Sequence, residues 1–206
     1  MVSKLDTAWD LFLEGKTSEA KKLVEQDFSI DTCTDFSLLN LMGYLLLAEK
    51  DYASCTRIFE KYILLAQQNE DKEHEHIGLH QLAMIYREQG NFHKALKLIE
   101  DEEKIIEEQF PNDNLKKAVN NYEQGYVRFK LNNLDEALTF MNLSLEQSLE
   151  TDDVISQACS YRGLGEIYLA LEDKGLANTH FKRAIELFES VGEFEGVKEI
   201  EELINR

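Results

Sequence analysis

The sequence predicts an all-α protein built as an array of antiparallel helix pairs, and three observations carry this prediction. A small residue follows a helical marker position by nine residues in five places, and the five small residues are Ala20, Cys55, Ala95, Ala137 and Ala177. The apolar residues at 79, 82, 83 and 86 keep the i, i+3, i+4, i+7 spacing of a helix with one buried face. The 206 residues are 43% hydrophobic and include one proline and 10 glycines, which suits a helical fold with an apolar core.

The recurring spacing has a mechanical cause in the packing of two helices. A small residue halfway along the first helix lets the second helix approach closely, and a small residue on the second helix occupies the other side of the contact. A bulky apolar residue four positions later fills the gap before the next pair. These three roles fall on Ala8, Gly43, Ala83, Gly125 and Gly165, then on the five small residues above, and finally on Val24, Phe59, Ile99, Met141 and Phe181.

This pattern resembles the tetratricopeptide repeat family. The residues that match the family consensus best are Tyr161, Leu164, Gly165, Tyr168, Ala177 and Phe181. The resemblance implies a right-handed α-solenoid of five helix hairpins and a C-terminal capping helix, forming a single domain over 1–206. It also implies that the first helix of each hairpin lines a concave groove.

The five hairpins are expected at about 3–30, 35–70, 73–110, 114–150 and 153–191. The first is a weak copy, because Lys4 and Thr7 stand where large apolar residues are usual. The second and third copies keep the small and bulky positions, and Pro111 should stop the second helix of the third. The fourth departs at Arg128, where an aromatic residue is usual, and the fifth is the best match.

A last helix is expected at 194–205, after a break at Gly192. Its apolar stripe, at Val197, Ile200 and Ile204, should face the fifth hairpin, while glutamates keep the other face in water. A solenoid needs such a polar outer surface at its end. The sequence therefore predicts a capping helix here.

The later repeats are longer than the usual period of about 34 residues. The small second-helix residue advances by 35 residues from Ala20 to Cys55, then by 40, 42 and 40 residues to Ala95, Ala137 and Ala177. Lengthened repeats of this kind are similar to those of bacterial peptide-sensing regulators and of kinesin light chains.

Charge and the lack of targeting segments limit the partners. The net charge is −18, which argues against nucleic acid and acidic membranes, because those partners are bound through cationic contacts. The N-terminus has no secretory apolar run, and no stretch approaches the roughly 20 apolar residues of a membrane span. We therefore expect a cytoplasmic protein whose three cysteines, Cys33, Cys55 and Cys159, are buried free thiols.

The sequence offers little for catalysis, and we expect neither an enzyme nor a cofactor. It contains no nucleophile elbow, phosphate-binding glycine loop or dinucleotide motif. The nearest approach to a metal site is His74, His76 and His80, but the order of the metalloprotease motif is missing and no third ligand is fixed by spacing. We expect no metal and interpret His74 and His76 as exposed residues at a helix start.

Aligning the first helices of the hairpins predicts a binding surface for a protein or peptide segment. Amides and guanidinium groups can hold the carbonyls of an extended peptide, and tyrosines supply flat contact area. The alternative interpretation is a solvated surface with no ligand. The predicted binding residues are Asn40, Tyr44, His80, Met84, Arg87, Tyr122, Tyr126, Lys130, Arg162 and Glu166.

A carboxylate clamp, which other members of the family use for chaperone tails, is not expected, because Leu5 and Trp9 replace its lysine and asparagine. Trp9, Phe12 and Leu13 instead form an apolar patch that could bind a partner, a second copy in a homodimer, or the second hairpin. The leading functional hypothesis is a non-catalytic protein-binding or peptide-binding scaffold. The alternatives are a peptide sensor that acts through a protein partner and, last, an enzyme with an unrecognised pocket.

Overall fold

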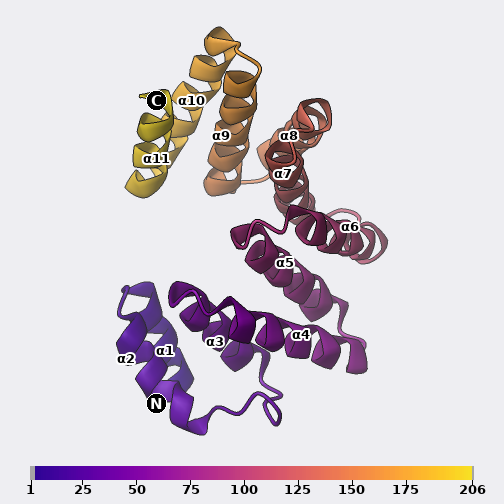
Figure 1. Ribbon diagram of the computed structural model, residues 1–206, viewed down its shortest axis with the longest axis vertical. Helices are drawn as coiled ribbons and strands as arrows, with labels where there is room; N and C mark the ends of the chain where they lie inside the picture. The colour runs from indigo at the N-terminus through magenta and orange to yellow at the C-terminus, as the bar shows by residue number, and fades with distance from the viewer. Residues whose placement is uncertain (1–2, 206) are drawn as a thin grey trace. The chain divides into compact units, whose positions relative to one another are not determined.

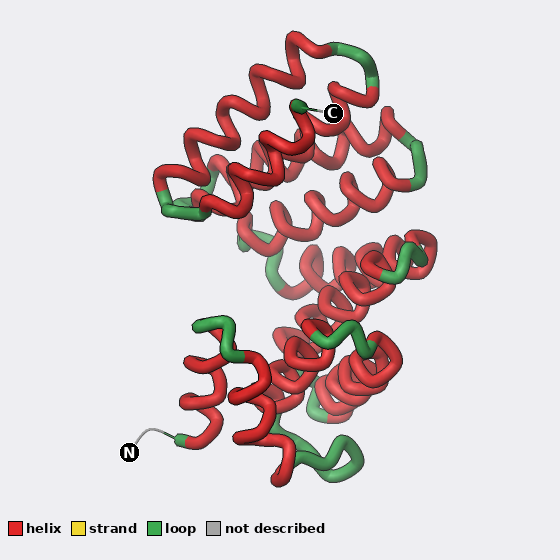
Figure 2. The backbone as a smooth tube through the Cα atoms, turned by 60° about the vertical axis from the view of Figure 1, so that its left-hand side comes forward, coloured by secondary structure: helices red, strands yellow, loops and turns green. Residues whose placement is uncertain are grey.

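The computed structural model describes residues 3–205, and these residues form eleven α-helices and one short 3₁₀ helix without any strand. Figure 2 shows the described chain as red helices joined by green loops. The all-α fold expected from the repeat spacing is thereby confirmed. The chain divides into two compact units, one ending at Leu98 and one beginning at Ile99.

The first unit is built from successive helix pairs (Figure 1). They are α1 Lys4–Leu13 with α2 Thr17–Val24, which runs into the 3₁₀ helix η1 Glu25–Asp27, then α3 Phe36–Ala48 with α4 Tyr52–Gln68, and α5 Lys72–Glu88 with the first residues of α6 Phe92–Gln109. The core of this unit contains the small second-helix residues Ala20 and Cys55 together with Leu39, Leu45 and Phe59, all of them fully buried.

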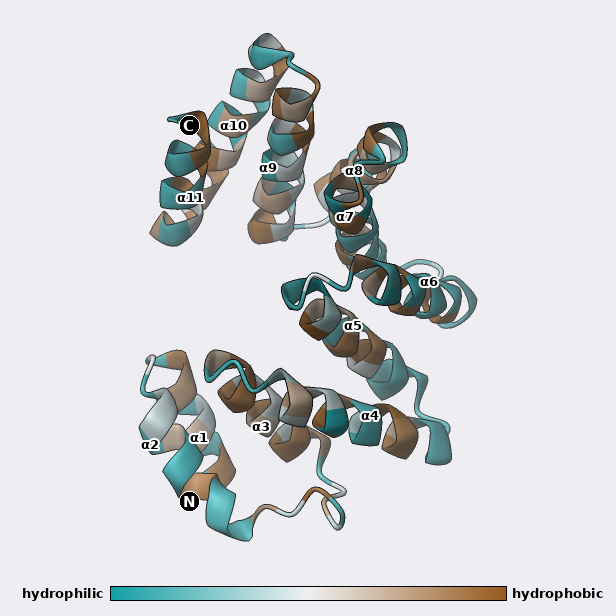
Figure 3. Ribbon diagram, in the orientation of Figure 1, coloured by the Kyte–Doolittle hydropathy of each residue, from teal (hydrophilic) through white to brown (hydrophobic). Residues whose placement is uncertain are grey.

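The second unit contains the rest of α6 and five further helices, which are α7 Asn114–Lys130, α8 Leu134–Leu149, α9 Val154–Ala170, α10 Lys174–Ser190 and α11 Phe194–Ile204. Its core gathers Ala137, Met141, Leu164, Ala177 and Phe181. The helix α6 ends two residues before Pro111, as the ring of that proline requires. In Figure 3, α6 is drawn largely in the hydrophilic colour.

Close helix packing depends on the small residues that the sequence singled out. A Cβ added at Gly165 would lie 2.5 Å from the ring of Phe181, well inside van der Waals contact. In the hairpin before it, a Cβ at Gly125 would lie 3.1 Å from the backbone nitrogen of Met141. A side chain at Gly165 would therefore collide with the second helix, and one at Gly125 would force the neighbouring backbone to shift.

Most of the longer helices begin with an aspartate cap. The carboxylate of each cap residue accepts a hydrogen bond from the backbone N–H three residues later, which satisfies one of the free donors of the first turn. The six aspartate caps are Asp35, Asp51, Asp71, Asp113, Asp153 and Asp173. At Asp71 this backbone hydrogen bond is also the main reason why the carboxyl pKa is lowered.

The tight turns inside the hairpins each place one residue in the left-handed backbone region. Gly15 and Gly90 adopt it without a steric cost, as does Gly192 in the turn before α11, with φ between 72° and 77°. Lys50, Asn132 and Glu172 hold the equivalent geometry with φ of 59°, 62° and 63° despite carrying side chains. Turn shape therefore follows the packing of the two helices and not the local sequence alone.

The capping helix α11 departs from the sequence expectation in one residue. Ile200 is fully buried and Val197 packs beside it, but Ile204 is 46% exposed and Leu203 packs against the core in its place. The helix ends at Ile204, so its last side chain has no further turn to hold it against α10.

The three cysteines are free thiols, but they differ in burial. Cys55 is fully buried, and its Sγ donates to the carbonyl oxygen of Gly43 at 3.5 Å. Cys33 and Cys159 are only half-buried, so the expectation of three buried thiols is correct for Cys55 alone.

Candidate functional site

The ten predicted binding residues lie on the first helices of successive hairpins. The structure places Asn40 and Tyr44 on α3, and His80, Met84 and Arg87 on α5, in the first unit. In the second unit it places Tyr122, Tyr126 and Lys130 on α7, with Arg162 and Glu166 on α9. The predicted row therefore consists of two groups, one in each compact unit.

Tyr44, in the first group, packs against aromatic residues of α1. Its ring stacks on Phe12 with centroids 5.8 Å apart and meets the edge of Trp9 at 6.0 Å. Burial raises the pKa of its hydroxyl, and hydrogen bonds with Gln81 and Asn40 oppose that effect. Tyr44 therefore packs beneath α1, and its ring offers a partner less area than the sequence suggested.

The same contacts show what covers the N-terminal apolar patch. The indole Nε1 of Trp9 donates to Ser37 Oγ at 2.9 Å, and Phe12 lies against Tyr44. Two members of the patch thus pack on the second hairpin, which is one of the three outcomes that the sequence allows. Leu13 points away and is 77% exposed.

The α5 residues of the first group are half-buried. The Nη2 of Arg87 lies 3.2 Å from Glu88 Oε1 on the same helix. Asn40, one helix pair earlier, has a buried carbonyl oxygen that accepts no hydrogen bond among the described residues. The hollows at Arg57 in the first unit are lined by other residues.

The α7 residues of the second group form an aromatic column. The rings of Tyr122 and Tyr126 stack with centroids 6.2 Å apart, at an interplanar angle of 16°. The Nζ of Lys130 lies 5.0 Å from the centre of the Tyr126 ring, within the range of a cation–π contact. The column thus runs from a tyrosine beside α9 to a cation at the end of α7.

Arg162 on α9 is held by two glutamates. Its Nε donates to Glu166 Oε1 at 3.1 Å, and its Nη1 donates to Glu199 on α11. Burial lowers the pKa of Arg162, but Tyr122, Glu166 and Glu199 together raise it by more, so the group stays charged. Two of its three nitrogens are therefore engaged within the protein.

A hollow of about 510 Å³ opens between α7 and α9, beside Tyr122. This is within the size range of small ligand sites, roughly 300–1,000 Å³. Two of its lining side chains are partly exposed apolar groups, Leu115 at 38% and Ile155 at 42%. The full lining consists of Leu115, Val119, Tyr122, Glu123, Asp153, Ile155, Ser156 and Cys159.

The thiol and the phenol in the lining of this hollow are neutral near pH 7. Burial raises the pKa of Cys159 to about 11 and that of Tyr122 well above its usual value. The carboxylate of Asp153 caps α9 by accepting from the Ser156 N–H at 2.6 Å. The hollow is thus an apolar surface with acids at Glu123 and Asp153.

Sequence reasoning selected Tyr122 but missed the other apolar lining residues. Leu115, Val119, Tyr122 and Tyr126 keep helical i, i+4, i+7, i+11 spacing along α7, so the predicted row extends toward the start of that helix. The signal in the sequence that could have revealed the hollow was this apolar stripe on α7, which is longer than the packing of one helix pair requires. Ile155 and Cys159 form the matching stripe on α9.

The histidine cluster of α5 is not arranged around a metal. The ring of His74 packs on Phe36 at a tilt of 32°, with centroids 3.9 Å apart, and is half-buried. His76 is buried, with its Nε2 3.5 Å from Glu73 Oε1. The interpretation of both histidines as exposed is therefore wrong, because the side chain of Phe36 covers one and the helix packing covers the other. Among residues 3–205 no group of three or more His, Cys, Asp or Glu side chains could hold a metal ion.

Within the described part of the chain, every helix is too short or too polar to cross a membrane.

Comparisons with known proteins agree with this architecture. Residues 114–190, the fourth and fifth hairpins, match the tetratricopeptide repeat family model. None of the curated proteins matches the chain at a significant level. The fourth hairpin is therefore recognisable in spite of Arg128.

Solved structures share the fold over nearly the whole length. A putative kinesin light chain from Podosopora anserina, with nearly identical TPR-like repeats, aligns with TM-score 0.68 at 16% identity over 91% of this chain and 94% of that chain. BtubC from P. vanneervenii aligns with TM-score 0.67 at 18% identity, covering 98% and 91%. MamA from AMB-1 aligns with TM-score 0.61 at 20% identity, covering 92% and 99%.

At these identities the solved structures show the fold, and the family model supplies the direct sequence match. The family model thus identifies the fourth and fifth hairpins as tetratricopeptide repeats, and the solved structures show that the same fold extends over nearly the whole chain.

Proposed function

We propose that this protein is a non-catalytic scaffold that binds a segment of another protein through the face formed by α7 and α9. The single observation that carries the proposal is the apolar hollow beside Tyr122. Proteins in water seldom leave apolar side chains gathered in a concave surface unless something covers them. A bulky apolar side chain of the partner would bury Leu115 and Ile155 there.

The surroundings of the hollow favour binding over chemistry. A nucleophile or general base needs a group that ionises near neutral pH, and the raised pKa values of Cys159 and Tyr122 keep both protonated. The stacked tyrosines add flat contact area that loses little conformational entropy on binding. These properties support a recognition surface.

In this proposal the polar side chains among the predicted binding residues orient the bound partner. Arg162 is fixed by Glu166 and Glu199, which leaves its Nη2 to donate to a carbonyl of the partner. Lys130 lies at the far end of the tyrosine column. Of the predicted binding residues of α7 and α9, Tyr122 lines the hollow and the others would contact the partner beyond its edge. We propose that the partner is met in the cytoplasm.

A matched pair of substitutions tests the proposal. Peptides selected from a random display library against the intact protein would serve as probes, with affinity measured by fluorescence anisotropy. Leu115→Glu should weaken the affinity for a selected peptide by more than about tenfold, because burying a carboxylate under the peptide without a compensating cation or hydrogen bond is unfavourable. Leu143 on α8 has the same 38% exposure and lies outside the hollow, so Leu143→Glu should leave affinity unchanged. Equal effects of the two variants would refute the proposal.

A further inference from the structure

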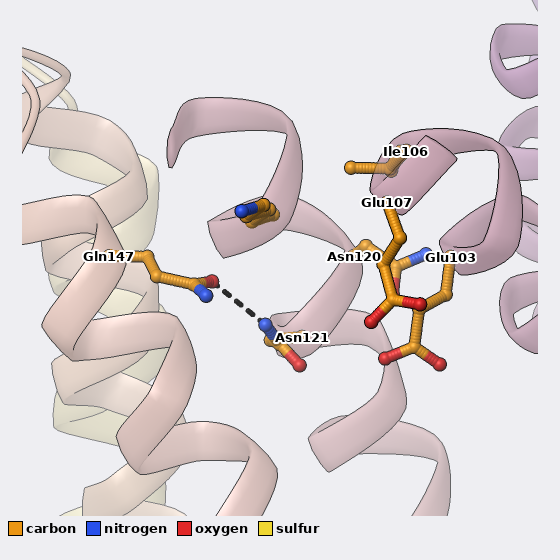
Figure 4. A pocket seen from close by; sticks show the side chains of 7 residues that line it. Glu103, Ile106, Glu107, Asn120, Asn121 and Gln147 are labelled. Atoms are coloured by element: carbon orange, nitrogen blue, oxygen red, sulfur yellow. Dashed lines mark hydrogen bonds between the residues drawn. The ribbon is translucent and has the colours of Figure 1, made fainter. Parts of the chain in front are cut away.

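A second and smaller pocket lies where α6, α7 and α8 meet, away from the residues that line the hollow. It has a volume of about 130 Å³, the space of roughly four water molecules. Its lining is mostly polar and comprises Glu103, Ile106, Glu107, Lys117, Asn120, Asn121 and Gln147. Figure 4 shows the carboxylates of Glu103 and Glu107 close together on one side, with Asn121 and Gln147 on the other.

The floor of this pocket is held by a network of buried side chains. Asn120, 2% exposed, donates through Nδ2 to the Ile99 carbonyl at 3.0 Å and to Glu102 Oε2 at 3.1 Å. Its own carbonyl oxygen accepts from Gln124 Nε2 at 3.0 Å. Because every polar group of Asn120 is satisfied, the floor is rigid before any ligand arrives.

Asn121 contributes an amide group to the lining of the pocket. Asn121 is more than nine-tenths buried, and its Nδ2 donates to Gln147 Oε1 at 2.8 Å. Its carbonyl oxygen points away from Gln147 in Figure 4. A carbonyl oxygen in the lining of a polar pocket can accept a hydrogen bond from a donor that enters the pocket.

Two glutamates make the lining of the pocket acidic. Glu103 and Glu107 are one helical turn apart on α6, where like charges repel. Burial raises the pKa of Glu103, the hydrogen bond from Gln124 lowers it, and the charge of Glu107 raises it again. The cation in the lining, Lys117, donates its ammonium to the carbonyl of Pro111 instead. A further cation in the pocket would relieve this repulsion.

We infer that this pocket binds the guanidinium group of an arginine in a partner protein. Three acceptors, two carboxylates and the Asn121 carbonyl, converge on a space too large for a bare ion, and a guanidinium offers five N–H donors in a planar fork. No set of three metal-binding side chains is present here within residues 3–205. The proposal is independent of the hollow between α7 and α9.

An arginine inside a chain fits the site better than a free amino acid. The same stretch of α6 carries Glu100, Asp101 and Glu108 in addition to the pocket glutamates, and the whole chain has a net charge of −18. This field attracts a basic segment but repels the carboxylate that free arginine carries. The structure thus favours a basic protein segment as the ligand.

The test uses a blocked glycine–serine peptide with one central arginine and its citrulline counterpart, which has the same shape without the charge. The full-length protein would be titrated by NMR, following the side-chain amide signals of Asn121 and Gln147. The arginine peptide should shift both signals and the citrulline peptide neither. Free arginine should bind more weakly than the blocked peptide.

Two adjacent exposed glutamates provide matched variants, of which Glu107 lines the pocket and Glu108 does not. Glu107→Gln should weaken the arginine peptide about tenfold, because a charge-assisted hydrogen bond is lost, and Glu108→Gln should leave it within about twofold. Three outcomes would each overturn the assignment: absent shifts, equal losses in both variants, or an affinity for spermidine equal to that for the arginine peptide.

Discussion

The guanidinium carbon of Arg128 lies 4.1 Å from the centre of the Phe140 ring, stacked between α7 and α8. Arg128 stands where the repeat consensus has an aromatic residue, and its planar group takes the place of that ring. The charge is met by Glu136 Oε2 at 3.0 Å and Glu100 Oε1 at 3.2 Å, and Gln124 Oε1 accepts at 2.8 Å. One side chain thereby ties α6, α7 and α8 together within the second unit.

Replacing Arg128 by Ala should lower the free energy of unfolding by about 2 kcal/mol. The variant would leave Gln124 without its donor, and the cation–π contact would be lost. The two glutamates are partly exposed, so their loss adds less than a fully buried pair would. Urea denaturation followed by circular dichroism measures the change. Arg128→Lys should restore less than half of the lost stability, because an ammonium group can neither stack on Phe140 nor donate to several acceptors in one plane. Full restoration by Lys would contradict this prediction.

Adding a methyl group at Gly165 should be destabilising, whereas the same change at Gly175 should not. The new Cβ at Gly165 would lie 2.5 Å from the Phe181 ring, and forcing such a contact costs about 1–3 kcal/mol. At Gly175 the nearest atom is Asp173 Oδ1 at 3.4 Å, so Gly175→Ala should stabilise the helix by about 0.5–1 kcal/mol. Thermal unfolding of both variants gives the comparison. If Gly165→Ala had the same melting temperature as Gly175→Ala, the close packing of α9 on α10 would be disproved.

The strained turns offer a stabilising substitution. Lys50 and Glu172 hold left-handed backbone angles, which cost a residue with a side chain about 1 kcal/mol. Lys50→Gly and Glu172→Gly should each raise the melting temperature, since these turns then match the one at Gly90. Gly90→Ala is the reverse control and should lower it, because no neighbouring atom lies within 4 Å and only the backbone angle is at stake. A lower melting temperature for both glycine variants would show that the extra conformational entropy of glycine in the unfolded chain outweighs the relief of backbone strain.

The sequence predicted the helix pairs because the contact between two helices needs small residues at fixed spacing, and Gly43, Gly125 and Gly165 meet that need locally. It did not predict the hollow, because Leu115 and Ile155 look like ordinary core positions until the neighbouring helix leaves them uncovered. Tyr44 shows the opposite case, a predicted binding residue whose ring is covered by α1. Arg128 looked like a defect since its partners Glu100 and Phe140 lie on two other helices. What spacing cannot reveal is which side chains from different helices meet.

The buried thiol of Cys55 should make the protein sensitive to alkali. Burial raises its pKa from 9.0 to about 11, so the unfolded chain loses this proton first as the pH rises. The stabilisation is complete below pH 9 and is lost progressively as the pH passes from 9 to about 11, because the unfolded state is then favoured by ionisation. Cys55→Ala, which places the usual small residue of the repeat at this contact, should keep the fold at pH 7 and flatten the decline, as measured by urea denaturation between about pH 8.5 and 10.5. Cys33→Ala is the matched control for thiol removal at a half-buried position. A decline equally steep in wild type and Cys55→Ala would assign the sensitivity to other groups.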